Sequence, residues 1–251
     1  MQGLFRICGK ALFKGQVNNL NNFWTELSSD FYDTFIAENR WKLFVNGTKT
    51  TLTVTFFALI VGIVLGFLIA IIRSTSDKTG KLRILNAVCK GYLTIVRGTP
   101  VLIQLMIIFY IIFGSSNNRI LASIIAFGLN SAAYVAEIVR SGIQSIDNGQ
   151  FEAGRSLGFN YPMTMWLIII PQAFKNILPA LANEFIVLIK ETSVSAMIGL
   201  SDLTYGGNLI RSRTYEAFFP LVSVAIIYLA MVMILEKCVA MLERRLKNSD
   251  H

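Results

Sequence analysis

The stretch EAGRSLGFNYPMTMWLIIIP, residues 152–171, is the least lipid-like part of a strongly apolar sequence. Charged residues such as Arg155 and breakers such as Gly158 and Pro162 make most of it unsuited to crossing a bilayer. Within it and just before it, residues 150–157 have helical composition, with apolar knobs and exposed charges side by side. We expect a short surface helix that offers side chains to a partner; an ordinary connecting loop has the same composition.

The composition around this stretch is that of a membrane protein. The chain has 251 residues, 54% of them hydrophobic, with a mean hydropathy of +0.57. Its length fits one domain, and its apolar runs of about 20 residues predict membrane helices. Cys8, Cys89 and Cys238 are far apart, and the single histidine is His251. We therefore expect no disulfide framework, no metal site and no catalytic residue.

Apolar runs predict five transmembrane helices and an all-α fold. The predicted spans are residues 51–72, 85–113, 120–146, 177–195 and 217–241, with the loop 147–171 between the third and fourth. Pro100 in the run Arg97-Gly98-Thr99-Pro100 predicts a break in the second span. Residues 1–46 predict an interfacial extension rather than a signal peptide, and residues 246–251 a short tail.

The positive charges orient these spans. If the loop 147–171 is cytoplasmic, the inner segments hold most of the basic residues that follow the first span, and the outer segments hold Arg119, Arg211 and Arg213. That distribution follows the positive-inside rule. Basic residues of the N-terminal extension, which is then outside, oppose it. We expect the loop and the C-terminus to be cytoplasmic, in a plasma or inner membrane.

Polar side chains recur inside the predicted spans. Asn130, Tyr134, Glu137 and Ser141 fall on one helical face. At 1.5 Å per residue, Arg97 lies roughly 24 Å from Phe113 along its helix, and Glu137 roughly 26 Å from Ile120. We expect Arg97 and Glu137 to be close, either as a structural ion pair or as groups that contact a solute. Glu184, about 10 Å into the fourth span, lies near the same level.

Residues 152–171 resemble a known motif. Glu152-Ala153-Gly154, then Gly158, then Ile168 and Pro171 are similar to the EAA loop of membrane subunits of ATP-driven, ABC-type importers. Gly154 replaces the second Ala of the family pattern, and Ile170 replaces a Leu. The resemblance implies that Glu152, Ala153, Gly154, Gly158 and Pro171 belong to a coupling helix that docks on an ATPase subunit.

Three further segments resemble the polar amino-acid permeases of the histidine/glutamate/glutamine/arginine/opine type. They are Arg97-Gly98-Thr99-Pro100 with Gln104, Asn130-Ser131-Ala132-Ala133-Tyr134 with Glu137, and Asn183-Glu184-Phe185 with Lys190-Glu191-Thr192-Ser193. The resemblance implies a type I importer permease domain over residues 47–245, working as a dimer. For the solute pathway we expect Arg97, Thr99, Gln104, Asn130, Tyr134, Glu137 and Glu184.

The partners follow from the same resemblance. The chain contains no GxxxxGK[ST], so ATP and Mg²⁺ are expected on a separate ATPase dimer rather than on this chain. A solute-binding protein outside the cell, a second permease subunit, identical or not, the lipid bilayer and an amino-acid solute complete the expected partners, with no nucleic acid. A passive channel or facilitator is the alternative, although it needs no loop shaped for an ATPase. An intramembrane enzyme is disfavoured by the absence of HExxH and of any membrane-embedded histidine.

Overall fold

The computed structural model describes residues 24–247, and every regular element in that part of the chain is helical. The amphipathic piece expected at the start of the chain and residues 248–251 of the tail fall outside it. A first helix covers residues 24–35, and a tight turn with positive φ at Glu38 and Asn39 leads into α2 (Trp41–Thr79). α2 starts inside the expected extension, so it is longer at both ends than the predicted span 51–72.

Four helical stretches are long and apolar enough to cross a membrane, and a bent pair makes up to five. The four are Ala37–Asp77, Arg119–Gln144, Tyr161–Ile198 and Phe218–Leu246, containing α2, α5 (Arg119–Gln144), α8 (Ile170–Glu191) and α10 (Phe218–Lys247). The bent pair is α3 (Arg83–Gly98) with α4 (Val101–Ile107), which continues as a π-helical turn to Ile112. The all-α, five-span prediction therefore agrees with the fold.

The second span is not a straight helix. α3 and α4 meet at 108°, and Pro100 sits between them in an extended conformation. The break itself is the one predicted from Pro100, because proline has no N–H and disfavours helix before it. However, the distance of Arg97 from Phe113 along a continuous helix is wrong, since the chain turns aside after Gly98.

The fourth span begins earlier than predicted. α7 (Tyr161–Thr164), a π-helical turn over Met165–Ile169 and α8 form one helical stretch from Tyr161, not from residue 177. Pro162 and Pro171 each occupy one of the first two positions of a helix, where a missing N–H is tolerated. Pro162, interpreted from the sequence as a helix breaker, therefore initiates a helix segment, as Pro171 does. Only α6 (Asn148–Ser156) and its flanking turns separate α5 from the next span.

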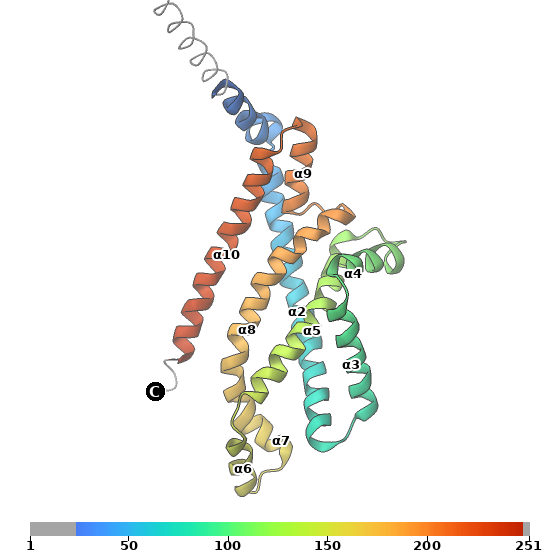
Figure 1. Ribbon diagram of the computed structural model, residues 1–251, viewed down its shortest axis with the longest axis vertical. Helices are drawn as coiled ribbons and strands as arrows, with labels where there is room; N and C mark the ends of the chain where they lie inside the picture. The colour runs from blue at the N-terminus through green and yellow to red at the C-terminus, as the bar shows by residue number, and fades with distance from the viewer. Residues whose placement is uncertain (1–23, 248–251) are drawn as a thin grey trace, which may run out of the picture.

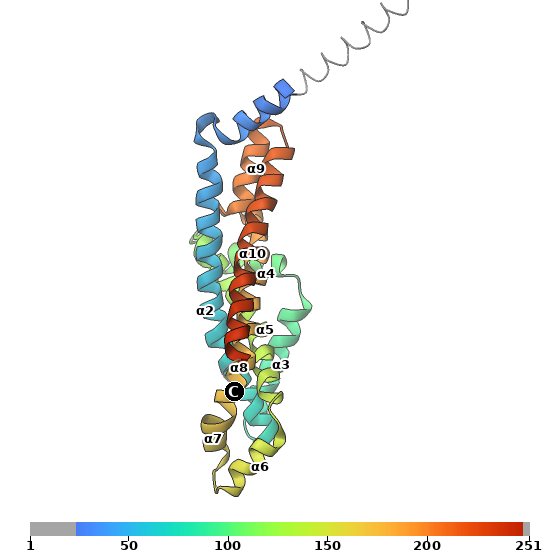
Figure 2. The ribbon, with the colours of Figure 1, turned by 90° about the vertical axis from the view of Figure 1, so that its left-hand side faces the viewer.

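The elements form an elongated bundle in which the polar segment around residues 147–164 and the polar segment over residues 201–216 lie at opposite ends. In Figure 1, α6 and α7 lie at the bottom and α9 (Leu203–Thr214) lies near the top, and Figure 2 shows the same separation after a quarter turn. α2 runs along most of the bundle and packs against α5. The charge-based orientation and the site described below both depend on this arrangement.

The contact between α2 and α5 requires a small residue at Gly128. A Cβ atom on Gly128 would lie 2.7 Å from Cγ1 of Val61 and 3.3 Å from the carbonyl oxygen of Ala58. Close approach of backbones through small residues is how membrane helices pack without help from the hydrophobic effect.

We expect Gly128→Ala to lower the free energy of unfolding by about 1–3 kcal/mol, because Val61 is β-branched and cannot move aside without strain. Gly91→Ala on α3 is the control, since nothing lies within 4 Å of the added Cβ. The control should be neutral or stabilising by up to about 1 kcal/mol, as alanine favours helix. Thermal unfolding of the detergent-solubilised complex measures both; equal effects would contradict the close packing.

Candidate functional site

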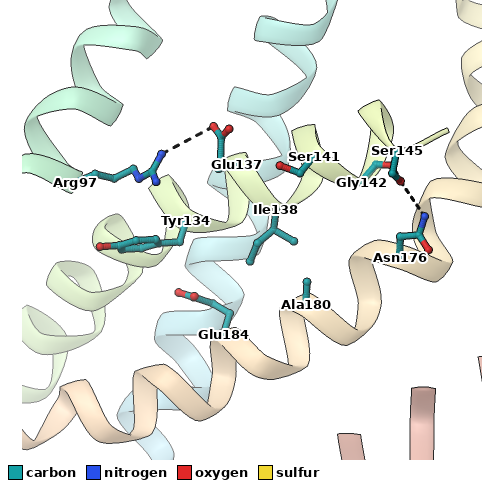
Figure 3. A pocket seen from close by; sticks show the side chains of 10 residues that line it. All are labelled: Arg97, Tyr134, Glu137, Ile138, Ser141, Gly142, Ser145, Asn176, Ala180 and Glu184. Atoms are coloured by element: carbon teal, nitrogen blue, oxygen red, sulfur yellow. Dashed lines mark hydrogen bonds and ion pairs between the residues drawn. The ribbon is translucent and has the colours of Figure 1, made fainter. Parts of the chain in front are cut away.

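A cavity of about 480 Å³ lies between the end of α3, the C-terminal half of α5 and the middle of α8. Its charged and aromatic lining comes from Arg97 on α3, Tyr134 and Glu137 on α5, and Glu184 on α8. Figure 3 shows Arg97 and Glu137 directed toward one another and Glu184 directed from α8 toward α5, with Ala180 and Asn176 on the preceding turns of α8. We call it the solute cavity. The spacing of Tyr134, Glu137 and Ser141 along α5 predicted this shared face.

Glu137 is held by three arginines. Its Oε2 lies 3.4 Å from Nη1 of Arg73 and 4.0 Å from Nη1 of Arg97, and its Oε1 lies 3.3 Å from Nη1 of Arg140. Arg140 also contacts Asp77 at 3.8 Å, near the end of α2. The predicted pairing of Arg97 with Glu137 is therefore present, but it is the longest of the three contacts.

Arg97 lies at the edge of the solute cavity with its charge largely unpaired. Its side chain is 45% exposed, and within residues 24–247 its only ion pair is the 4.0 Å contact with Glu137. The guanidinium carbon lies 5.7 Å from the centroid of the Tyr134 ring, within the range of a cation–π interaction. Tyr134 thus supports the position of Arg97 and leaves its N–H groups free for an anionic group.

Glu184 is the most buried charged residue of the cavity. It is 8% exposed, and its Oε1 accepts a 2.8 Å hydrogen bond from the hydroxyl of Ser131 on α5. No lysine or arginine in the described part of the chain forms an ion pair with it. A buried carboxylate without a cation is costly, so this site favours a positively charged ligand group.

Thr99, Gln104 and Asn130 lie at the broken helix rather than in the solute cavity. The Gln104 amide nitrogen donates to the carbonyl oxygens of Val96 (2.7 Å) and Thr99 (3.0 Å) and to the Thr99 hydroxyl (2.8 Å). The amide oxygen of Gln104 accepts from Asn130 Nδ2 at 3.1 Å. These bonds satisfy backbone groups that the break at Pro100 frees. A pathway role for these three residues stays a prediction.

The segment expected to dock an ATPase forms the short surface helix α6. Asp147 caps it by accepting from the N–H of Gly149 at 2.6 Å, and Gly158 with φ +81° follows its end. Glu152 and Ala153 are exposed, whereas Gly154 is buried. A Cβ on Gly154 would lie 2.7 Å from Thr164 Cγ2, so glycine lets α6 pack directly on α7. Pro171, also exposed, starts α8.

Residues 152–171 also contain a sequence pattern that is typical of serine hydrolases. Residues 154–158, Gly-Arg-Ser-Leu-Gly, spell the G-x-S-x-G of hydrolase nucleophiles. Ser156 lies at the end of α6 rather than on a strand-to-helix turn, and its hydroxyl donates to the Glu152 carbonyl oxygen at 3.0 Å. The match therefore lacks the structural context that a nucleophile needs.

Sequence reasoning missed Arg73, Arg140 and Asn176 as members of this region. Arg73 on α2 and Arg140 on α5 both lie inside helices and contact Glu137. Asn176 donates to the hydroxyl of Ser145 at 2.9 Å and lines the cavity. The i, i+3 spacing of Glu137 and Arg140 was the one available signal.

Comparison with known proteins places the chain among transport subunits. The family model described as "binding-protein-dependent transport system inner membrane component" matches residues 62–248. A putative glutamine transport system permease of Rickettsia conorii is 40% identical over 205 residues, 80% of this chain and 92% of that protein. The arginine transport system permease of Bacillus subtilis is 36% identical over 209 residues, 82% and 93% of the two chains.

Solved structures agree with the sequence relatives. An amino acid ABC transporter crystallised with histidines is 42% identical, with a TM-score of 0.74 over 81% of this chain and 94% of that one. An inward-facing methionine ABC transporter, at 22% identity and a TM-score of 0.72 over 84% and 99% of the two chains, shares the fold. The chain belongs to the family of binding-protein-dependent transport system inner membrane components.

Proposed function

We propose that this permease subunit moves a polar amino acid across the cell membrane, driven by ATP hydrolysis in a separate subunit. The single observation that carries the proposal is the solute cavity, in which an unpaired buried carboxylate and a partly free guanidinium come from different helices. The names of the relatives, which specify glutamine and arginine transport, and the solved amino acid ABC transporter support the same class of solute.

The cavity provides a partner for each charge of an amino acid. The ammonium group would meet Glu184, and the carboxylate would meet Arg97 beside Tyr134. Neither charge of a zwitterion can be left bare at membrane depth, because each would lose its hydration without replacement. Glu137, which the sequence suggested as the partner of the ammonium, already forms ion pairs with three arginines. We therefore assign the ammonium to Glu184 and give Glu137 the role of holding Arg97.

The energy for transport would enter through α6. We propose that its exposed face around Glu152 docks on an ATPase dimer that binds ATP and Mg²⁺, with a solute-binding protein at the opposite end of the bundle and a second permease subunit alongside. Then α6 and the end of α10 are cytoplasmic, and Arg119, Arg211 and Arg213 lie outside, as the positive-inside rule requires.

The solute class is tested with the whole complex in proteoliposomes. We expect saturable uptake of at least one of labelled arginine, histidine, glutamine and cystine, and uptake should require both ATP and the solute-binding protein. A labelled sugar of similar size serves as the control solute, since it carries no charge for Glu184 or Arg97 to meet. Uptake of the sugar at the same rate, or equal amino-acid uptake without ATP, would favour a passive facilitator instead.

A further inference from the structure

A second cavity, of about 630 Å³, lies among α2, α3 and α5 and shares Arg97, Tyr134 and Glu137 with the solute cavity. Its other charged lining residues are Arg73 from α2, Lys90 from α3 and Arg140 from α5. We call it the cationic groove. Lys90 and Arg97 are seven residues apart on α3, two helical turns on one face, so both reach the same space.

The groove carries far more positive than negative charge. Four cations, Arg73, Lys90, Arg97 and Arg140, line it against a single carboxylate, Glu137. Asp77 contacts Arg140 at 3.8 Å but is not part of the lining. Like charges gathered at membrane depth repel one another, and an arrangement of this kind is stabilised when an anion enters.

The donors of these cations are mostly unused. Arg73 is only 12% exposed, yet among the described residues its one side-chain hydrogen bond is the 3.4 Å contact with Glu137, and its buried Nε finds no acceptor there. The Nε of Arg140 is likewise buried without an acceptor. In the described part of the chain, the Lys90 ammonium forms no ion pair or hydrogen bond. One carboxylate has about four lone-pair sites and cannot satisfy these groups.

The unused donors converge from three helices, which suits a tetrahedral oxyanion. A phosphate group offers several oxygens in different directions, and arginine pairs with it through two parallel N–H donors. Arg73 lies about 9 Å from the end of α2, and Arg140 about 6 Å from the end of α5, both at the α6 end of the bundle. That depth also suits the headgroup of an anionic phospholipid, for which basic pockets between membrane helices are known sites.

We propose that the cationic groove is a phosphate-class oxyanion site, filled by the headgroup of an anionic phospholipid or by free phosphate. The proposal is independent of the ATPase dock, because it rests on the charges and free donors of α2, α3 and α5; the groove shares Arg97 and Glu137 with the solute cavity, so its test uses Lys90, which lines the groove alone. An occupant there would neutralise Arg73 and Arg140 and so strengthen the contact between Arg97 and Glu137 at the rim of the solute cavity.

The test uses the assembled complex in nanodiscs of phosphatidylcholine, titrated with dihexanoyl phosphatidylglycerol in one arm and inorganic phosphate in the other. Lys90→Gln removes a charge whose side chain has no partner, so the fold should be kept. Lys81→Gln, on the turn between α2 and α3, removes the same charge outside the groove. We expect about tenfold weaker binding of at least one probe in Lys90→Gln, the effect of one charge-assisted contact, and wild-type binding in Lys81→Gln.

The two arms distinguish a lipid headgroup from free phosphate as the occupant, and a second variant covers the case in which the first does not assemble. A loss confined to phosphatidylglycerol assigns the groove to a lipid headgroup, and a loss confined to phosphate assigns it to the free ion. Binding of phosphate to the ATPase subunits is common to all variants and cancels in the comparison. Thr94→Glu puts a carboxylate at an exposed groove position and should abolish binding. It provides the test if Lys90→Gln fails to assemble. Equal affinity of the wild type, Lys90→Gln and Thr94→Glu for both probes would overturn the proposal.

Discussion

Glu152→Lys will uncouple ATP hydrolysis from solute delivery while leaving the permease assembled. The Glu152 side chain is exposed on α6 and has no partner in the described part of the chain, so its replacement removes no internal contact. A reversed charge at a docking surface opposes the complementary charge of its partner at a cost of several kcal/mol. We expect the stimulation of ATP hydrolysis by the solute-loaded binding protein to fall at least about tenfold in proteoliposomes.

Glu26→Lys supplies the matched control. Glu26 is exposed on the helix over residues 24–35, at the end of the bundle opposite α6, and its replacement changes the net charge equally. That variant should keep the ATPase subunits bound and the basal rate of hydrolysis near the wild-type value; its basal rate is the control, because the solute-binding protein is proposed to dock at this end. Normal stimulation in Glu152→Lys, with ATPase subunits bound in normal amount, would remove Glu152 from the dock.

Glu184→Gln will reduce amino-acid uptake by about 10- to 100-fold, because it takes away the one charge that an ammonium can meet in the solute cavity. A hydrogen bond to a charged group contributes about 1.5–3 kcal/mol, which corresponds to that range. Glutamine keeps the size of the side chain and can still accept from Ser131, so packing should be unchanged. Initial rates of labelled amino-acid uptake by the whole complex measure the effect.

Ser131→Ala separates the charge of Glu184 from its structural hydrogen bond. It removes the 2.8 Å donor but leaves the carboxylate in place. If the charge binds the solute, Ser131→Ala should retain much more uptake than Glu184→Gln. Equal losses in the two variants, with matching losses in thermal stability, would instead indicate that the pair only holds α5 against α8.

The sequence predicted the fold well where single residues dominate local conformation. Apolar runs located both ends of α5 and the start of α10 closely, although α10 runs on to Lys247, and Pro100 located the break between α3 and α4. It failed where proline starts a helix rather than ending one. Asn160 caps the helix that Pro162 starts by accepting from the N–H of Met163, and Pro171 follows a π-helical turn.

The candidate site was predicted in part, and for a partly mistaken reason. Arg97 and Glu137 do meet, but through the bend after Gly98 and not through equal depth along two straight helices. The role of Arg73 could not be inferred, because α2 extends beyond the apolar window 51–72, and only the fold brings Asp77 of α2 to Arg140. Asn130 shares the helical face of Tyr134, yet its amide donates to Gln104, because the break after α3 places Gln104 next to it.

The most direct test of the account is transport through a filled solute cavity. Ala180 lines the cavity between Glu184 and Asn176, and Ala180→Trp would place a bulky ring in part of its 480 Å³, beside Glu184. In proteoliposomes with ATP and the binding protein, the wild type should accumulate a labelled amino acid above its outside concentration. Ala180→Trp should assemble and hydrolyse ATP at the basal rate but accumulate none. Wild-type accumulation by the assembled Ala180→Trp complex would contradict the account, because the solute would then cross elsewhere.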